Sequence, residues 1–142
     1  MTAQLAVALV LGVLAAAEDL RSRCVPNWMT GAAVIAAVLV AVGGGWHALA
    51  RTVAGSAVGF AILLPLYALG GMGGGDIKLM AAFGALLGPS AAIEAAVFGA
   101  VLGGVVAAAA RIFAPKVRSI PYAPVLVLGS WVALWGGGAH AF

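Results

Sequence analysis

The sequence has 142 residues, of which 65% are hydrophobic and only 8% are charged, and its formal net charge is +3. A soluble domain carries about a quarter charged residues, so too few polar side chains are present here to cover a surface that faces water. The composition excludes a nucleic-acid-binding domain as well, because the seven basic residues are dispersed among apolar runs and form no basic face. It predicts an all-α fold, a single membrane-embedded helical bundle over residues 1–142.

Apolar runs separated by glycine, proline or charge predict about six transmembrane helices. They span roughly Ala3–Ala17, Trp28–Val42, Leu49–Leu69, Ile77–Leu87, Ala91–Ala110 and Val125–Ala139. The first run lacks a basic n-region and an acidic pair follows it, so we expect a retained helix rather than a cleaved signal peptide. The fourth run is short: its length corresponds to about 16 Å of helix, which cannot alone cross a hydrocarbon core of ~30 Å.

The distribution of basic residues favours six crossings with the N-terminus outside. In that topology the loops after the first, third and fifth helices share the cytoplasmic face, and only Arg51 lies opposite. The basic residues on the shared face are Arg21, Arg23, Lys78, Arg111, Lys116 and Arg118. If the fourth run turned back, the basic residues would divide almost evenly, which the positive-inside rule disfavours. With six crossings, the short fourth helix begins below the interface, and the glycine-rich loop before it bends into the membrane.

Two aspartates fall on the same predicted face of the membrane. Six crossings place Asp19 at the end of the first helix and Asp76 directly before the fourth, both on the cytoplasmic side. Two aspartates that share a pocket tend to hold one proton between them, because like charges at short range cannot both ionise cheaply. Such a pair can activate a water molecule and protonate a peptide carbonyl without a covalent intermediate.

Each of these residues also has a simpler interpretation, which the sequence leaves open. Asp76 can cap the helix that follows it, a role compatible with catalysis, and Asp19 can be a solvated charge paired with a nearby arginine. Glu18 is then its interfacial neighbour, and Glu94 is expected to snorkel or pack near the outer interface. Lys78 can act on Asp76 through its charge, anchor the loop at the headgroups, or serve only as a positive-inside charge.

Other chemistries find no support in the residue pattern. The sequence has no metal-ligand constellation, no Ser/His/Asp set and no phosphate-loop signature, so we expect no metal and no cofactor. Besides hydrolysis, the residues leave open a small proton- or cation-coupled transporter or channel component, or a structural assembly subunit. No acid lies at the centre of a long span, which counts against transport.

Three stretches, in this order, resemble blocks of one family, the type IV prepilin peptidases. "EDLRSRCVPNWMT" (Glu18–Thr30) resembles a block in which an aspartate precedes an arginine-containing turn and a Pro-Asn pair. "GGGDIK" (Gly73–Lys78) resembles the Gly-x-Gly-Asp-x-Lys motif, whose Gly-x-Gly-Asp core also occurs in presenilins and archaeal preflagellin peptidases. "SIPYAPVLVLG" (Ser119–Gly129) resembles the C-terminal Ile-Pro-aromatic-x-Pro segment.

The resemblance implies a membrane aspartyl endopeptidase that cleaves the leader of prepilin or pseudopilin precursors after a glycine. It implies Asp19 and Asp76 as the catalytic pair, and Gly73, Gly75 and Lys78 as motif or substrate-binding residues. It further implies a multi-pass protein of the bacterial inner membrane, with the active site toward the cytoplasm and the lipid bilayer and precursors as partners. The paired Cys-x-x-Cys motifs of the long bifunctional members are lacking, so we expect no methyltransferase activity. The length resembles the short peptidases of Flp-type (Tad) pilus systems.

Overall fold

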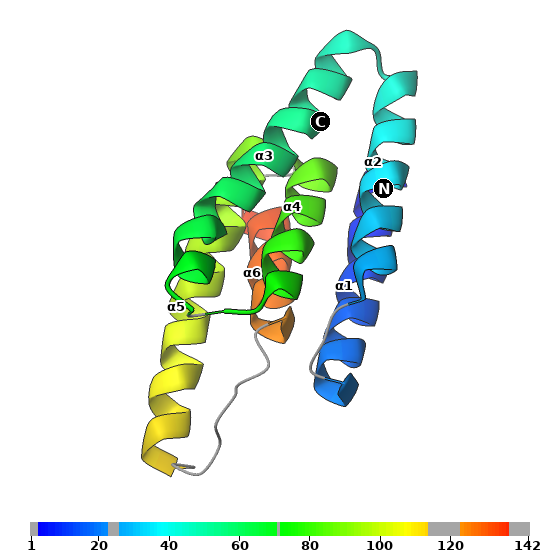
Figure 1. The fold of residues 1–142 in the computed structure, drawn as a ribbon. Helices are drawn as coiled ribbons and strands as arrows, with labels where there is room; N and C mark the ends of the chain where they lie inside the picture. The colour runs from blue at the N-terminus through cyan, green and yellow to red at the C-terminus, as the bar shows by residue number, and fades with distance from the viewer. Residues whose placement is uncertain (1–2, 23–25, 71, 114–122, 137–142) are drawn as a thin grey trace.

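A computed structural model of the chain describes residues 3–22, 26–70, 72–113 and 123–136. Six helices and no strand lie within these ranges (Figure 1), which confirms the all-α prediction. The helices are α1 (Ala3–Ser22), α2 (Asn27–Gly43), α3 (Trp46–Ala68), α4 (Gly74–Leu87), α5 (Pro89–Phe113) and α6 (Ala123–Gly136). Each predicted apolar run coincides with one helix, although several ends differ by a few residues.

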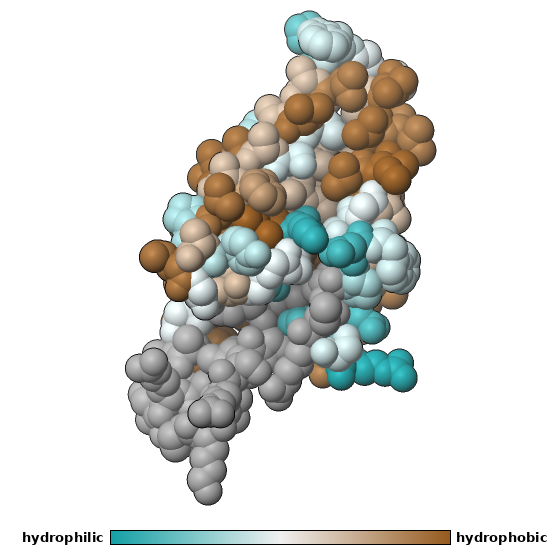
Figure 2. Space-filling view, viewed as in Figure 1, coloured by the Kyte–Doolittle hydropathy of each residue, from teal (hydrophilic) through white to brown (hydrophobic). Residues whose placement is uncertain are grey.

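Successive helices run in opposite directions through the bundle. As a result, the end of α1 and the starts of α2 and α4 lie toward the same end of the molecule (Figure 1). Hydrophilic surface gathers at this level, whereas the surface over α2 and α3 beyond it is largely hydrophobic (Figure 2). The alternation places the segments with the two candidate aspartates on one side, as six crossings require.

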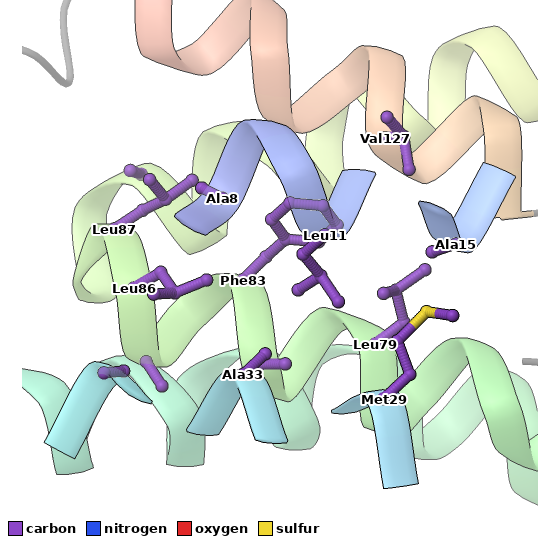
Figure 3. Close-up of a cluster of buried hydrophobic side chains, with 14 residues drawn as sticks. Ala8, Leu11, Ala15, Met29, Ala33, Leu79, Phe83, Leu86, Leu87 and Val127 are labelled. Carbon is purple, nitrogen blue, oxygen red and sulfur yellow. The ribbon is translucent and has the colours of Figure 1, made fainter. Parts of the chain in front are cut away.

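The short helix α4 occupies the centre of the bundle. It packs against all five other helices, and ten of its fourteen residues are buried. The side chain of Phe83 in α4 lies against Leu11 of α1, and Leu79 lies near Met29 of α2 (Figure 3). Since apolar burial in a close-packed interior resists displacement, these contacts hold α4 along its length.

Glycines bring α3 and α4 into backbone contact. A Cβ atom at Gly55 would overlap the carbonyl oxygen of Gly84, and a Cβ atom at Gly59 would overlap that of Met80. Small residues at such positions let membrane helices approach closely. Gly55, Gly59 and Gly84 therefore permit the close packing of α3 and α4.

Within the described part of the chain, two stretches are long and apolar enough to cross a membrane: α3, and residues Pro89–Val106 of α5. Helix α2 is apolar but shorter, and α4 has only 14 residues, about 21 Å of helix. Six crossings therefore remain a prediction. Part of the charge count also lies outside the described residues, namely Arg23, Lys116 and Arg118, and the side chain of Arg111 is likewise not described.

Candidate active site

Asp76 lies inside the first turn of α4 and not directly before the helix. Helix α4 begins at Gly74, three residues earlier than predicted, so two glycines of the expected loop are helical. The backbone N–H of Gly73 donates to Oδ2 of Asp76 at 3.2 Å, and the N–H of Asp76 donates to the Gly73 carbonyl at 3.2 Å. The first bond is the acid's half of a capping box, with Asp76 at the third helical position; the second joins two backbone groups, because Gly73 has no side chain. Asp76 therefore caps the helix from inside its first turn, and not as the N-cap, which is Gly73.

The Asp76 carboxylate is held in place and largely removed from solvent. The residue is only 8% exposed, and one of its oxygens is engaged by the helix start. A buried carboxylate is costly unless hydrogen bonds or a shared proton compensate it. Asp76 therefore has the restricted orientation that acid–base chemistry requires.

Asp19 is buried on the inner face of α1. Its exposed fraction is 5%, and it continues the series Ala8, Leu11 and Ala15, which spacings of three and four residues place on one helical face. The interpretation of Asp19 as a solvated charge is therefore wrong. Helices α1 and α4 pack against each other, and the end of α1 and the start of α4 lie toward the same end of the bundle (Figure 1). Two segments that are remote in the sequence thus contribute one carboxylate each to the same region.

Lys78 contacts a residue that the sequence did not single out. Its Nζ donates to Oδ1 of Asn27, the first residue of α2, at 2.9 Å. Asn27 belongs to the Pro-Asn pair of the first motif block, so this hydrogen bond joins the first block to the second. The Pro-Asn pair was the available signal, but nothing local in the sequence points from it to Lys78.

The motif glycines leave space rather than supply unusual backbone angles. Gly73 has φ −79° and ψ 155°, an extended conformation that other residues adopt, and a Cβ atom there would lie 3.4 Å from Oδ2 of Asp76. A Cβ atom at Gly74 would lie 3.5 Å from the Tyr67 ring. Gly75 is half-buried in the first turn. The left-handed conformation occurs earlier, at Gly70, with φ 73°.

The other two acids lie in different surroundings. Glu18 is half-buried, and its Oε1 accepts a hydrogen bond from Ser22 Oγ at 3.4 Å within α1. Glu94 is half-buried in the first turns of α5, at the far end of that helix from its cytoplasmic terminus in the predicted topology. Within the described part of the chain, no three His, Cys, Asp or Glu residues gather as a metal ion would require.

An apolar groove of about 350 Å³ lies between α1 and α2. Its walls include Val7, Val10 and Leu14 of α1, which lie on a different face of that helix from Asp19. The groove therefore opens away from the two aspartates. Lipid chains suffice to cover such a surface in a bilayer, so it does not form part of the candidate site.

A comparison with known families matches the chain to the type IV leader peptidase family over residues 6–108. No curated protein and no solved structure matches the chain. The matched residues include both aspartates, Asp19 and Asp76, together with Asn27 and Lys78. They cover well over half of the sequence, and they indicate a membrane-associated peptidase. The chain therefore belongs to the type IV leader peptidase family.

Proposed function

We propose that the chain is a membrane aspartyl endopeptidase that removes the leader peptide of type IV, Flp-like prepilins. The observation that carries the proposal is the pair of buried carboxylates, Asp19 from the end of α1 and Asp76 from the start of α4, which lie toward the same end of the bundle (Figure 1). Membership in the leader peptidase family supports a peptidase activity. Neither acid lies in the middle of its helix, so nothing favours a proton or cation pathway over hydrolysis.

The proposed chemistry is general acid–base hydrolysis with one proton shared by the two carboxyl groups. The ionised carboxylate takes a proton from a water molecule, and the water oxygen bonds to the scissile carbonyl carbon. The protonated partner gives its proton to the carbonyl oxygen, which produces a tetrahedral diol. When the C–N bond breaks, the carboxyl group that took the water proton gives it to the leaving nitrogen. The other carboxylate takes a proton from one diol hydroxyl, and the carbonyl reforms as the carboxylic acid of the leader. The starting protonation state is restored without a covalent intermediate.

The substrate would reach the site from the cytoplasm. In the proposed topology, the hydrophilic surface near the starts of α2 and α4 faces the cytoplasm (Figure 2), and the hydrophobic helix of the precursor lies in the bilayer beside the bundle. The exposed cations Arg21 and Lys78 lie at this level, as the positive-inside rule requires. The proposal therefore includes a location in the bacterial inner membrane, with prepilin precursors as partners and no nucleic acid.

Cleavage of a co-expressed Flp-type prepilin tests the proposal. We expect the wild-type chain to convert the precursor to the shorter mature form on an immunoblot, and Asp19→Asn and Asp76→Asn each to lower the rate by about a hundredfold or more. Glu18→Gln is the matched control, since it neutralises the adjacent acid on another face of α1 and should leave cleavage unchanged. Normal processing by either Asn variant, with all variants folded in detergent, would show that the mechanism is wrong.

A further inference from the structure

The hydrogen bond between Lys78 and Asn27 connects the first turns of two helices. The Lys78 amine lies two residues beyond Asp76, and the Asn27 amide lies at the first position of α2. The donor and acceptor are 2.9 Å apart and 51 residues apart in the sequence. The contact, which is exposed, joins the start of α4 directly to the start of α2.

The other contacts of α4 act in different ways or at other points of the helix. Apolar packing and the backbone contact with α3 hold α4 along its length, and the bond to Asn27 adds a directional contact between the start of α4 and α2. The bond between Gly73 and Asp76 lies within one turn and moves with it. At the other end of the helix, Arg51 Nη2 donates to the Leu87 carbonyl at 3.3 Å, far from the aspartates.

The α2 side of the contact is itself well anchored. The Asn27 carbonyl accepts a hydrogen bond from Oγ1 of the buried Thr30 at 3.1 Å, and Met29 packs in the same core cluster as Ala15 of α1. Helix α2 begins five positions after α1 ends at Ser22. The last turn of α1, which carries Asp19, and the first turn of α2 are therefore held in one local unit.

We propose that Lys78 is a positioning residue, which sets the distance and orientation of Asp76 relative to Asp19 through its hydrogen bond to Asn27. This inference rests on the proposed function for its catalytic consequence. A direct electrostatic role would depend on the positive charge of Lys78. The positioning role depends instead on the hydrogen-bond donor of Lys78 and the hydrogen-bond acceptor of Asn27. A misplacement of a reacting group by about 1 Å can cost on the order of a hundredfold in rate.

Variants of Asn27 distinguish a positioning role of Lys78 from an effect of its charge. The side chain of Asn27 does not cap α2, whose N-cap is Pro26, so a change there leaves the helix start intact. Asn27→Leu keeps a similar volume and removes the acceptor, and we expect it to lower kcat about tenfold, with KM within about twofold of wild type. Asn27→Asp keeps an oxygen acceptor in the same place and should cleave within about threefold of wild type. Normal kcat for Asn27→Leu would overturn the inference.

A double-mutant cycle tests whether Lys78 acts through its hydrogen bond to Asn27. Lys78→Met retains the aliphatic stem and removes the donor, and it should lower kcat by about as much as Asn27→Leu. If the two residues act through their shared bond, the double variant will be no slower than the slower single variant. Multiplied effects in the double variant would mean that Lys78 acts independently of Asn27 and would overturn the inference.

Thermal unfolding of the purified protein in detergent separates failure of this inference from failure of the proposed function. If the wild-type chain leaves the precursor uncut, the proposed function is contradicted. The melting temperatures of the wild type, Asn27→Leu, Lys78→Met and the double variant still report whether the two residues are coupled. We expect the losses in Tm of the single variants to be non-additive in the double variant. Additive losses, or no loss in either single variant, would contradict the positioning contact whatever the activity.

Discussion

The close approach of α3 and α4 makes Gly55→Ala a severe test of the fold. The new Cβ atom would overlap the Gly84 carbonyl oxygen and would lie 2.8 Å from the carbonyl carbon of the same residue, where ordinary contact begins at 3.4 Å. It would also lie 2.9 Å from the carbonyl carbon of Gly88. All three atoms belong to the backbone and cannot rotate away, so the two helices must separate by roughly half an ångström or more.

Overpacking of this kind costs about 1–3 kcal/mol. We expect Gly55→Ala to lower the free energy of unfolding by that amount, measured as a reduced Tm in detergent by tryptophan fluorescence. Because α4 carries Asp76, the displacement should also reduce prepilin cleavage by about tenfold at temperatures where the variant is still folded.

The same substitution at Gly31 of α2 is the matched control. A Cβ atom at Gly31 meets nothing within 4 Å, and replacement of a helical glycine by alanine stabilises by roughly 0.5–1 kcal/mol. Gly31→Ala should therefore melt at or above the wild-type temperature and cleave normally. If Gly55→Ala melts together with Gly31→Ala, the backbone contact between α3 and α4 is not as the structure places it.

The other predictions concern the two ends of α4 and the topology. Gly73→Pro fits the local φ but removes the N–H that donates to the Asp76 carboxylate, so it should impair cleavage strongly. Gly73→Ala keeps this N–H and should unfold at the wild-type Tm. Arg51→Met removes the donor to the last carbonyl of α4 and should lower stability by about 1–2 kcal/mol, with Arg51→Lys closer to wild type in the same melting assay. In a cysteine-free background, a membrane-impermeant maleimide should label Gly43→Cys in intact spheroplasts and Ser22→Cys only after permeabilisation, and the reverse pattern would contradict the proposed orientation.

The helical architecture follows from the sequence because apolar runs bounded by glycine, proline and charge correspond directly to helices. The start of α4 was predicted less well. Gly74 and Gly75 have low intrinsic helix propensity, and the sequence therefore indicated a loop up to Asp76. In the fold these glycines begin the central helix, where tertiary packing and the reciprocal bonds between Gly73 and Asp76 outweigh that propensity.

The candidate site was likewise predictable only in part from the sequence. Asp76 was identifiable from its glycine-rich approach, but Asp19 by itself looked more like a solvated charge, since burial depends on neighbours that the local sequence does not name. The spacing of Ala8, Leu11, Ala15 and Asp19 carries a signal for an inward face, and the structure bears it out. The contact from Lys78 to α2 depends on the packing of remote helices and could not be predicted from either motif block alone.

The central claim is that Asp19 and Asp76 act as one unit on one peptide bond. Single-turnover cleavage of a purified prepilin by the enzyme in proteoliposomes tests it most directly, with wild type, Asp19→Asn, Asp76→Asn and the double variant compared. Residues that act as a unit are strongly non-additive, so the account predicts that the double variant will be no slower than the slower single variant. Multiplied losses would mean that the two acids act separately, and cleavage near the wild-type rate by either single variant would contradict the shared-proton mechanism outright.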